Sequence, residues 1–140
     1  MAINMSVAFY VLILVCYSVV SVSASSTSQA ISCPGDVLTT ECTIMGGGVT
    51  VWRGTAFQCA RNEIALRHSQ FGGSYNYTAS CNNGAIVARA LGVVNDSYIS
   101  QLSVTVSLEL NNTTVECWHD GIHLFMFIRS IQIIVLVPGK

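Results

Sequence analysis

The chain has 140 residues, which suits one domain of ordinary size. Only 9% of its residues are charged, and six Lys and Arg against seven Asp and Glu leave a net charge of −1. Nucleic-acid binding requires a basic stripe that this composition does not provide, so nucleic acid is excluded as a leading partner. A hydrophobic content of 51% excludes intrinsic disorder as well.

The first expected element is an apolar N-terminal segment. Residues Val7 to Val22 are almost continuously apolar, and the small residue Ala24 follows them. This pattern predicts a cleaved secretory signal peptide; the alternative is an uncleaved anchor, although the run is shorter than the roughly 20 residues of a membrane span. The predicted organisation is a signal peptide, a short polar leader, one domain and a tail, at residues 1–24, 25–30, 31–137 and 138–140.

From residue 31 onward the sequence has the pattern of β-strands. Apolar and polar residues alternate, turn residues recur about every ten positions, and no helical period interrupts them. The expected strands, in chain order, are 37–44, 49–57, 63–68, 85–94, 101–110, 113–119 and 130–137. We therefore expect a single all-β domain, a sandwich or barrel.

Two of these segments carry detail that the structure can test. In 101–110, five alternate residues share one face: Leu102, Val104, Val106, Leu108 and Leu110. The segment 71–80 is rich in Gly, Ser and Tyr without an apolar period, and it is expected to be a loop.

Three residues give the domain a resemblance to a known family. Cys42 lies in the first expected strand, Trp52 lies in the next, and Cys117 lies near the other end. This arrangement resembles the immunoglobulin-like domains, in a divergent form closest to the variable type. The resemblance implies an antiparallel β-sandwich with a core disulfide between Cys42 and Cys117, and with Trp52 packed against it. Val115 stands where the family often has Tyr.

The remaining cysteines leave several pairings open. Removal of the signal peptide takes Cys16 away and leaves five cysteines, for which fifteen arrangements with one unpaired cysteine exist. Cys59 and Cys81 flank the same region, and we expect them to form a second disulfide. Cys33 is then left over, either as a buried thiol or as the site of an interchain bond.

No constellation of residues predicts catalysis, a metal or a cofactor. Cys117, His119 and His123 have a spacing superficially like that of zinc ligands, but cysteines of a secreted domain are expected to be oxidised. We find no nucleophile-elbow or zinc-protease motif, and we expect no catalytic residue.

Sequons and the expected disulfides indicate an extracellular address. The four candidate glycosylation sites of the mature chain all fall at expected loops or turns: Asn76, Asn95, Asn111 and Asn112. The last two overlap, so at most one of them is expected to carry a sugar.

Two apolar stretches are candidates for contact with a partner. The outer face of one sheet is expected to be apolar, and the run 122–128 follows a turn at Asp120. Either the last strand begins early and buries this run, or the run is exposed for a partner. The candidate contact residues are Val49, Val51, Trp118, Leu124, Phe125 and Phe127.

The functional expectation is a secreted or cell-surface immunoglobulin-like module for recognition or adhesion, without catalysis. Its partner is expected to be an extracellular protein or a glycan, or a second copy of the chain. Membrane contact is expected only through an uncleaved leader or another chain. The alternatives are the N-terminal ligand-binding domain of a truncated receptor and, less favoured, a small disulfide-rich secreted enzyme or inhibitor.

Overall fold

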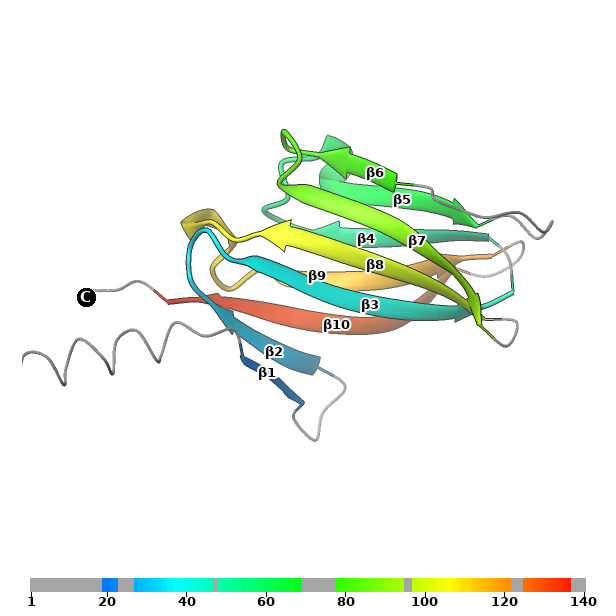
Figure 1. Ribbon diagram of the computed structural model, residues 1–140, viewed down its shortest axis with the longest axis horizontal. Helices are drawn as coiled ribbons and strands as arrows, with labels where there is room; N and C mark the ends of the chain where they lie inside the picture. Colours follow the sequence, from blue (N-terminus) through cyan, green and yellow to red (C-terminus); the bar gives the residue numbers. More distant parts are fainter. Residues whose placement is uncertain are drawn as a thin grey trace, which may run out of the picture.

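The structure, a computed structural model, describes residues 19–22, 27–46, 48–68, 78–94, 97–121 and 125–136. Its larger sheet contains β1 (Val19–Val22), β2 (Thr27–Ser32), β10 (Phe125–Val135), β9 (Thr114–Asp120), β4 (Gly48–Gly54) and β5 (Glu63–His68), in that order. The smaller sheet contains β3 (Val37–Met45), β8 (Ser97–Thr105), β7 (Ile86–Val94) and β6 (Thr78–Cys81). The two sheets stack as layers (Figure 1), which confirms the expected all-β sandwich.

The larger sheet contains one parallel pair of strands among the described residues. β2 runs parallel to β10, whereas the other strand pairs among the described residues are antiparallel. The parallel register places Ser130 beside Thr27 and Val135 beside Ser32. The last strand is therefore held between an early strand, β2, and the strand that precedes it, β9.

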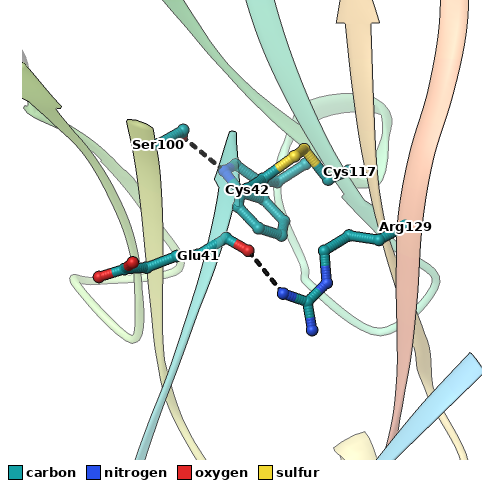
Figure 2. Close-up of a disulfide and its surroundings, with 6 residues drawn as sticks. Glu41, Cys42, Ser100, Cys117 and Arg129 are labelled. Atoms are coloured by element: carbon teal, nitrogen blue, oxygen red, sulfur yellow. Dashed lines mark hydrogen bonds between the residues drawn. A yellow bond between two sulfur atoms is a disulfide. The ribbon is translucent and has the colours of Figure 1, made fainter. Parts of the chain in front are cut away.

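A disulfide and a tryptophan occupy the space between the layers. Cys42 of β3 and Cys117 of β9 are bonded, with an S–S distance of 2.02 Å, so the bond joins the two sheets. Trp52 of β4 is 1% exposed, and its indole N–H donates to Ser100 Oγ at 2.8 Å. Figure 2 shows this arrangement around the disulfide. Because the one polar atom of the indole has a partner, the ring is buried without an unsatisfied donor.

Alternation of side chains builds the rest of the core. In β8, every second residue from Tyr98 to Val104 is buried, and in β3 the buried residues include Leu38, Cys42 and Ile44. This period of two is what the sequence pattern predicts for strands with one face on a core. Each fully buried aliphatic side chain contributes about 1.5–3 kcal/mol relative to an exposed one.

The strand expected at 101–110 has different bounds in the structure. β8 ends at Thr105, and a short 3-10 helix, η2 (Leu108–Leu110), follows it. The Leu110 N–H bonds the carbonyl of Ser107, and this turn points Leu110 into the core at 3% exposure while Leu108 is 56% exposed. The expected shared face therefore fails at Leu108, because a helical turn replaces the period of two before the chain enters β9.

The strand expected at 49–57 also ends early. β4 stops at Gly54, and the Phe57 ring, which is fully buried, folds back over that glycine. A Cβ on Gly54 would lie 2.6 Å from Phe57 Cδ1, so this close approach requires glycine. β4 cannot continue past Gly54 because the Phe57 ring packs over this end of the strand.

Two further differences concern segments that the sequence pattern did not predict as strands. Thr78–Cys81, within or next to the expected loop at 71–80, forms the edge strand β6 beside β7. β10 begins at Phe125 rather than at residue 130. In both cases the partner strand supplies the backbone hydrogen bonds that a weak local pattern did not predict.

Cys33 corrects an expectation about free thiols. Cys59 and Cys81 are bonded to each other, and Cys33 is buried and disulfide-bonded as well, so the described residues contain no free cysteine. The prediction of an unpaired Cys33 is wrong. It counted the five cysteines that remain without the signal peptide, whereas the whole chain has six, an even number that can pair completely.

Most of the predicted signal peptide lies outside the described residues. Its residues Val19–Val22 form β1, which pairs antiparallel with β2 at the edge of the larger sheet. The predicted cleavage position after Ala24 is not among the residues that the structure describes. Within the described ranges there is no helix with the length and apolar character that crossing a membrane requires.

Candidate functional site: the outer face of the larger sheet

The outer surface of β5, β4, β9 and β10 carries the candidate site, which we call the aromatic face. Three neighbouring strands bring Val51, Trp118 and Phe127 side by side in one row. A second row pairs Asp120 with Phe125. We define the aromatic face by the side chains of Val49, Val51, Arg53, Trp118, Phe125 and Phe127.

Strand alternation decides which residues reach this face. Trp52 and Cys117 point into the core, so their neighbours along each strand point to the opposite side of the sheet. On β4 this rule turns Arg53 outward, and on β9 it turns Trp118 outward. The same residues that fix the core therefore also fix the composition of the outer face.

An aromatic cluster stands at the centre of the face. The Trp118 and Phe125 rings are stacked, with centroids 4.7 Å apart and planes 6° apart. Phe127 meets Trp118 edge to face, with centroids 5.4 Å apart. Phe125 and Phe127 are nevertheless 43% and 39% exposed. The rings pack against each other in the favoured stacked and edge-to-face arrangements, and part of their apolar surface is still exposed to solvent.

Arg53 adds a cation to the cluster. Its guanidinium carbon lies 4.9 Å from the centroid of Phe125 and 5.6 Å from that of Trp118. Its Nε donates to Glu63 Oε2 at 3.0 Å, which fixes the guanidinium between a carboxylate and two rings. The sequence-based set of contact residues did not include Arg53. The alternation that places Trp52 inward was the signal that could have found it.

The two valines of the predicted contact set differ from the aromatics. Val51 points outward but is only 7% exposed, and Val49 is partly buried. Val51 therefore supports the face and offers little contact area itself. Leu124 of the predicted set lies outside the described residues.

Trp118 has an unusual environment for an indole. The ring is partly buried, and its Nε1 is fully buried without a hydrogen-bond acceptor among the described residues. An unpaired buried donor costs about 1–3 kcal/mol. Trp118 is thus held in place by ring stacking and not by its polar atom.

A β-bulge separates the exposed part of β10 from its buried part. The register with β9 shifts between Phe127 and Arg129, and beyond it Ile131 and Ile133 enter the core. Arg129 Nη1 donates to the backbone carbonyl of Glu41 on β3 at 2.8 Å (Figure 2), which ties β10 to the opposite sheet. Bulges commonly re-aim side chains in this way.

The bulge decides between the two interpretations of the run 122–128. The last strand does begin early, at Phe125, as the first interpretation states. Burial of the run is wrong for Phe125, Met126 and Phe127, which are exposed. Residues 122–124 of the run are outside the described residues.

The other residues singled out from the sequence do not converge on this face. The Cys117 sulfur is bonded to Cys42, so it is not a thiolate ligand, and His123 is outside the described residues. Among the residues that the structure describes, no group of three candidate ligands could hold a metal ion.

Two of the four sequons can be placed. Asn111 and Asn112 are exposed and lie just before the start of β9, whereas Phe125 pairs with the end of that strand. Asn111 Oδ1 accepts a hydrogen bond from the Val135 N–H at 3.0 Å. Asn76 and Asn95 lie outside the described residues.

A scan against protein-family models finds no match for the chain, and a search of curated proteins finds none either.

Proposed function

We propose that the chain is an immunoglobulin-like recognition module that acts outside the cell, secreted or at the cell surface, and binds a protein partner through the aromatic face without catalysis. The observation that carries this proposal is the cluster of the exposed Phe125 and Phe127 with the partly buried Trp118, and with Arg53 held over the rings of Phe125 and Trp118. Aromatic residues and Arg are the residue types most enriched at the energetic centres of protein interfaces.

The extracellular address is supported by the bonded cysteines and the sequons. Disulfides persist in oxidising compartments and are rare in the cytosol of most organisms. The immunoglobulin-like character is supported by the inter-sheet bond between Cys42 and Cys117 with Trp52 in the same core.

The arrangement of charges around the cluster suits a defined partner. β4 and β5 carry Arg53, Arg67 and Glu63, a net charge of +1, whereas β9 carries Glu116 and Asp120, a net charge of −2, so the two halves of the face differ in sign. A central apolar cluster with a charged rim is the usual anatomy of a protein interface. The rim sets which partner approaches and in which orientation.

The test is a double substitution of the two exposed rings, Phe125→Ser with Phe127→Ser. The purified chain, displayed in multivalent form, is measured for self-association and for binding to a panel of extracellular domains. Loss of two such contacts is expected to weaken binding by about 30-fold or more. The folded state should persist, since both rings are exposed.

Leu108→Ser with Val37→Ser is the matched control, because these apolar residues are also exposed but lie away from the face. This control is expected to bind like the wild type. Equal binding by the wild type and the two-phenylalanine variant, or no binding and no self-association by a folded wild type, contradicts the proposal.

A further inference from the structure

A polar pocket opens beside the aromatic face. Its volume is about 260 Å³, and it lies between the end of β4, the start of β9 and the loop that connects β4 to β5. The side chains that matter for its chemistry are Arg53, Thr55, Arg61, Asn62, Thr114 and Glu116. Nothing in the proposed protein contact requires this pocket.

Most of these polar side chains have no partner within the protein. Among the described residues, Thr55, Arg61, Asn62, Thr114 and Glu116 take part in no side-chain hydrogen bond or ion pair, and Arg53 bonds only Glu63. Thr55, Arg61, Asn62 and Thr114 are exposed, so their polar groups are free to bond a ligand, and a few such groups around one concavity can fix a ligand's orientation.

The pocket offers donors and acceptors in balance. The Arg61 guanidinium only donates, the Glu116 carboxylate only accepts, and the Asn62 amide and the two threonine hydroxyls do both. The charges also cancel, because Glu63 neutralises Arg53 through their ion pair, and the lining then holds one further cation, Arg61, and one anion, Glu116. A neutral ligand with many hydroxyl groups matches this lining better than an anion does.

The loop that forms one wall is fixed in place. Gln58, Arg61 and Asn62 have φ angles of 55°, 59° and 53°, a region that non-glycine residues seldom occupy. The disulfide between Cys59 and Cys81 anchors this loop to β6, and the Asn62 N–H bonds the Cys59 carbonyl at 2.9 Å. A wall held in this way loses little entropy when a ligand binds.

The pocket and the aromatic cluster share Arg53. Arg53 lines the pocket, and its guanidinium lies over the rings of Trp118 and Phe125, which lie beside the pocket and are not part of its lining. Glu116 lies two residues before Trp118 on the same face of β9. A pyranose ring has hydroxyls at its rim and apolar C–H groups on its faces. A polar pocket beside an aromatic ring is complementary to both features of a pyranose, because the pocket can bond the hydroxyls and the ring can pack against the C–H face.

We propose that this pocket binds one neutral pyranose unit of a glycan. Its hydroxyls bond Arg61, Asn62, Glu116 and the threonines, and its C–H face lies toward the aromatic cluster. The proposal goes beyond the protein contact assigned above and stands whether or not that contact exists.

The test uses the purified, fully oxidised chain and the methyl glycosides of glucose, galactose, mannose and N-acetylglucosamine. Saturation-transfer NMR and titration of backbone amide shifts report binding and its location. At least one glycoside is expected to bind and to shift the amides of residues 53–55, 61–62 and 114–116. Glucuronic and sialic acid form the charged arm, and an acidic peptide forms the protein arm.

Two substitutions change the polar groups without straining the loop: one removes an amide, and the other replaces a long guanidinium with a shorter amide. Asn62→Gly and Arg61→Asn suit the positive φ angles of these positions. Each is expected to weaken sugar binding by about tenfold or more. Arg67→Gln on β5 removes an arginine that is exposed on the same sheet outside the pocket, and it should leave sugar binding unchanged.

Four results overturn the inference. They are the absence of binding by every neutral glycoside, tighter binding of an acidic sugar or of the acidic peptide, shifts confined to residues outside the pocket, and an Arg67→Gln loss equal to that of Arg61→Asn. Circular dichroism and the count of bonded cysteines by mass spectrometry establish that each variant is folded. The protein contact is tested separately by Phe125→Ser with Phe127→Ser, so the two proposals fail independently.

Discussion

The two tryptophans of this chain lie on adjacent strands and meet opposite environments. Trp52 on β4 pairs with Cys117, and Trp118 on β9 pairs with Val51, so each indole leaves the sheet on a different side. Trp52 is almost fully buried and donates to Ser100, whereas Trp118 is partly buried, stacks on Phe125 and has no acceptor among the described residues.

This difference separates stability from recognition. Trp52 completes a core in which packing and hydrogen bonding are both satisfied, and its removal therefore affects the whole fold. Trp118 organises exposed rings whose apolar area remains available to a partner. The predictions below test this separation between the inner and outer sides of the sheet.

The largest effect is expected from the bond at the centre of the inner side. Cys42→Ala with Cys117→Ala opens a link across a sequence separation of 75. In the chain-entropy model such a link contributes about 4.5 kcal/mol, a large share of the roughly 5–15 kcal/mol stability of a domain. Urea unfolding and secreted yield measure the loss, and we expect little folded protein at 37 °C.

Cys59→Ala with Cys81→Ala serves as the control, since this link spans a sequence separation of only 22. The same model assigns it about 3 kcal/mol, so the variant should remain more stable than the first. If the variant without the Cys59–Cys81 bond is the less stable of the two, the central position assigned to the Cys42–Cys117 bond is wrong.

Leu110 and Leu108 provide a second comparison within one turn. Leu110→Ala removes a buried side chain and is expected to lower the free energy of unfolding by about 3 kcal/mol. Leu108→Ala removes an exposed one and should change it by less than about 0.5 kcal/mol. Equal effects in urea unfolding would mean that 101–110 is one continuous strand.

Trp52→Phe tests the hydrogen bond of the inner indole. The smaller ring leaves a gap, and the fully buried Ser100 hydroxyl loses the hydrogen bond from the indole N–H. We expect a loss of about 2–3 kcal/mol in the free energy of unfolding. Trp52→Phe combined with Ser100→Ala should recover part of this loss, because no polar group is then left unpaired.

Trp118→Phe is the matched change on the outer side, and it is expected to have a smaller effect than Trp52→Phe. The substitution removes an indole N–H that is unpaired among the described residues and keeps a ring beside Phe125. The free energy of unfolding should change by less than about 1 kcal/mol. A loss as large as that of Trp52→Phe would remove the distinction between the two sides.

Local pattern predicted the elements of the fold better than their ends. The alternation in β3 and β8 predicted their buried faces, because a strand with one side on a core has a period of two in any all-β fold. The ends of β4 and β8 depend on Phe57 covering Gly54 and on the turn that buries Leu110. Both are contacts made after the strand, which a strand pattern does not contain.

The aromatic face was predicted only in part. Alternation along β9 identified Trp118, but the exposure of Phe125 and Phe127 depends on the bulge before Arg129. The polar pocket was not predicted, since its walls come from segments more than fifty positions apart in the sequence. Neither the bulge in β10 nor the packing of those segments against each other produces a periodic pattern in the amino-acid sequence.

Composition and periodicity by themselves determined that this chain forms a two-sided β structure, because alternating side chains have to bury one face whatever the topology. Tertiary structure alone decided that Cys33 is bonded, which strand covers which, and that the last strand carries its rings into solvent. Those outcomes depend on distances between residues far apart in the chain, and a linear pattern does not encode such distances.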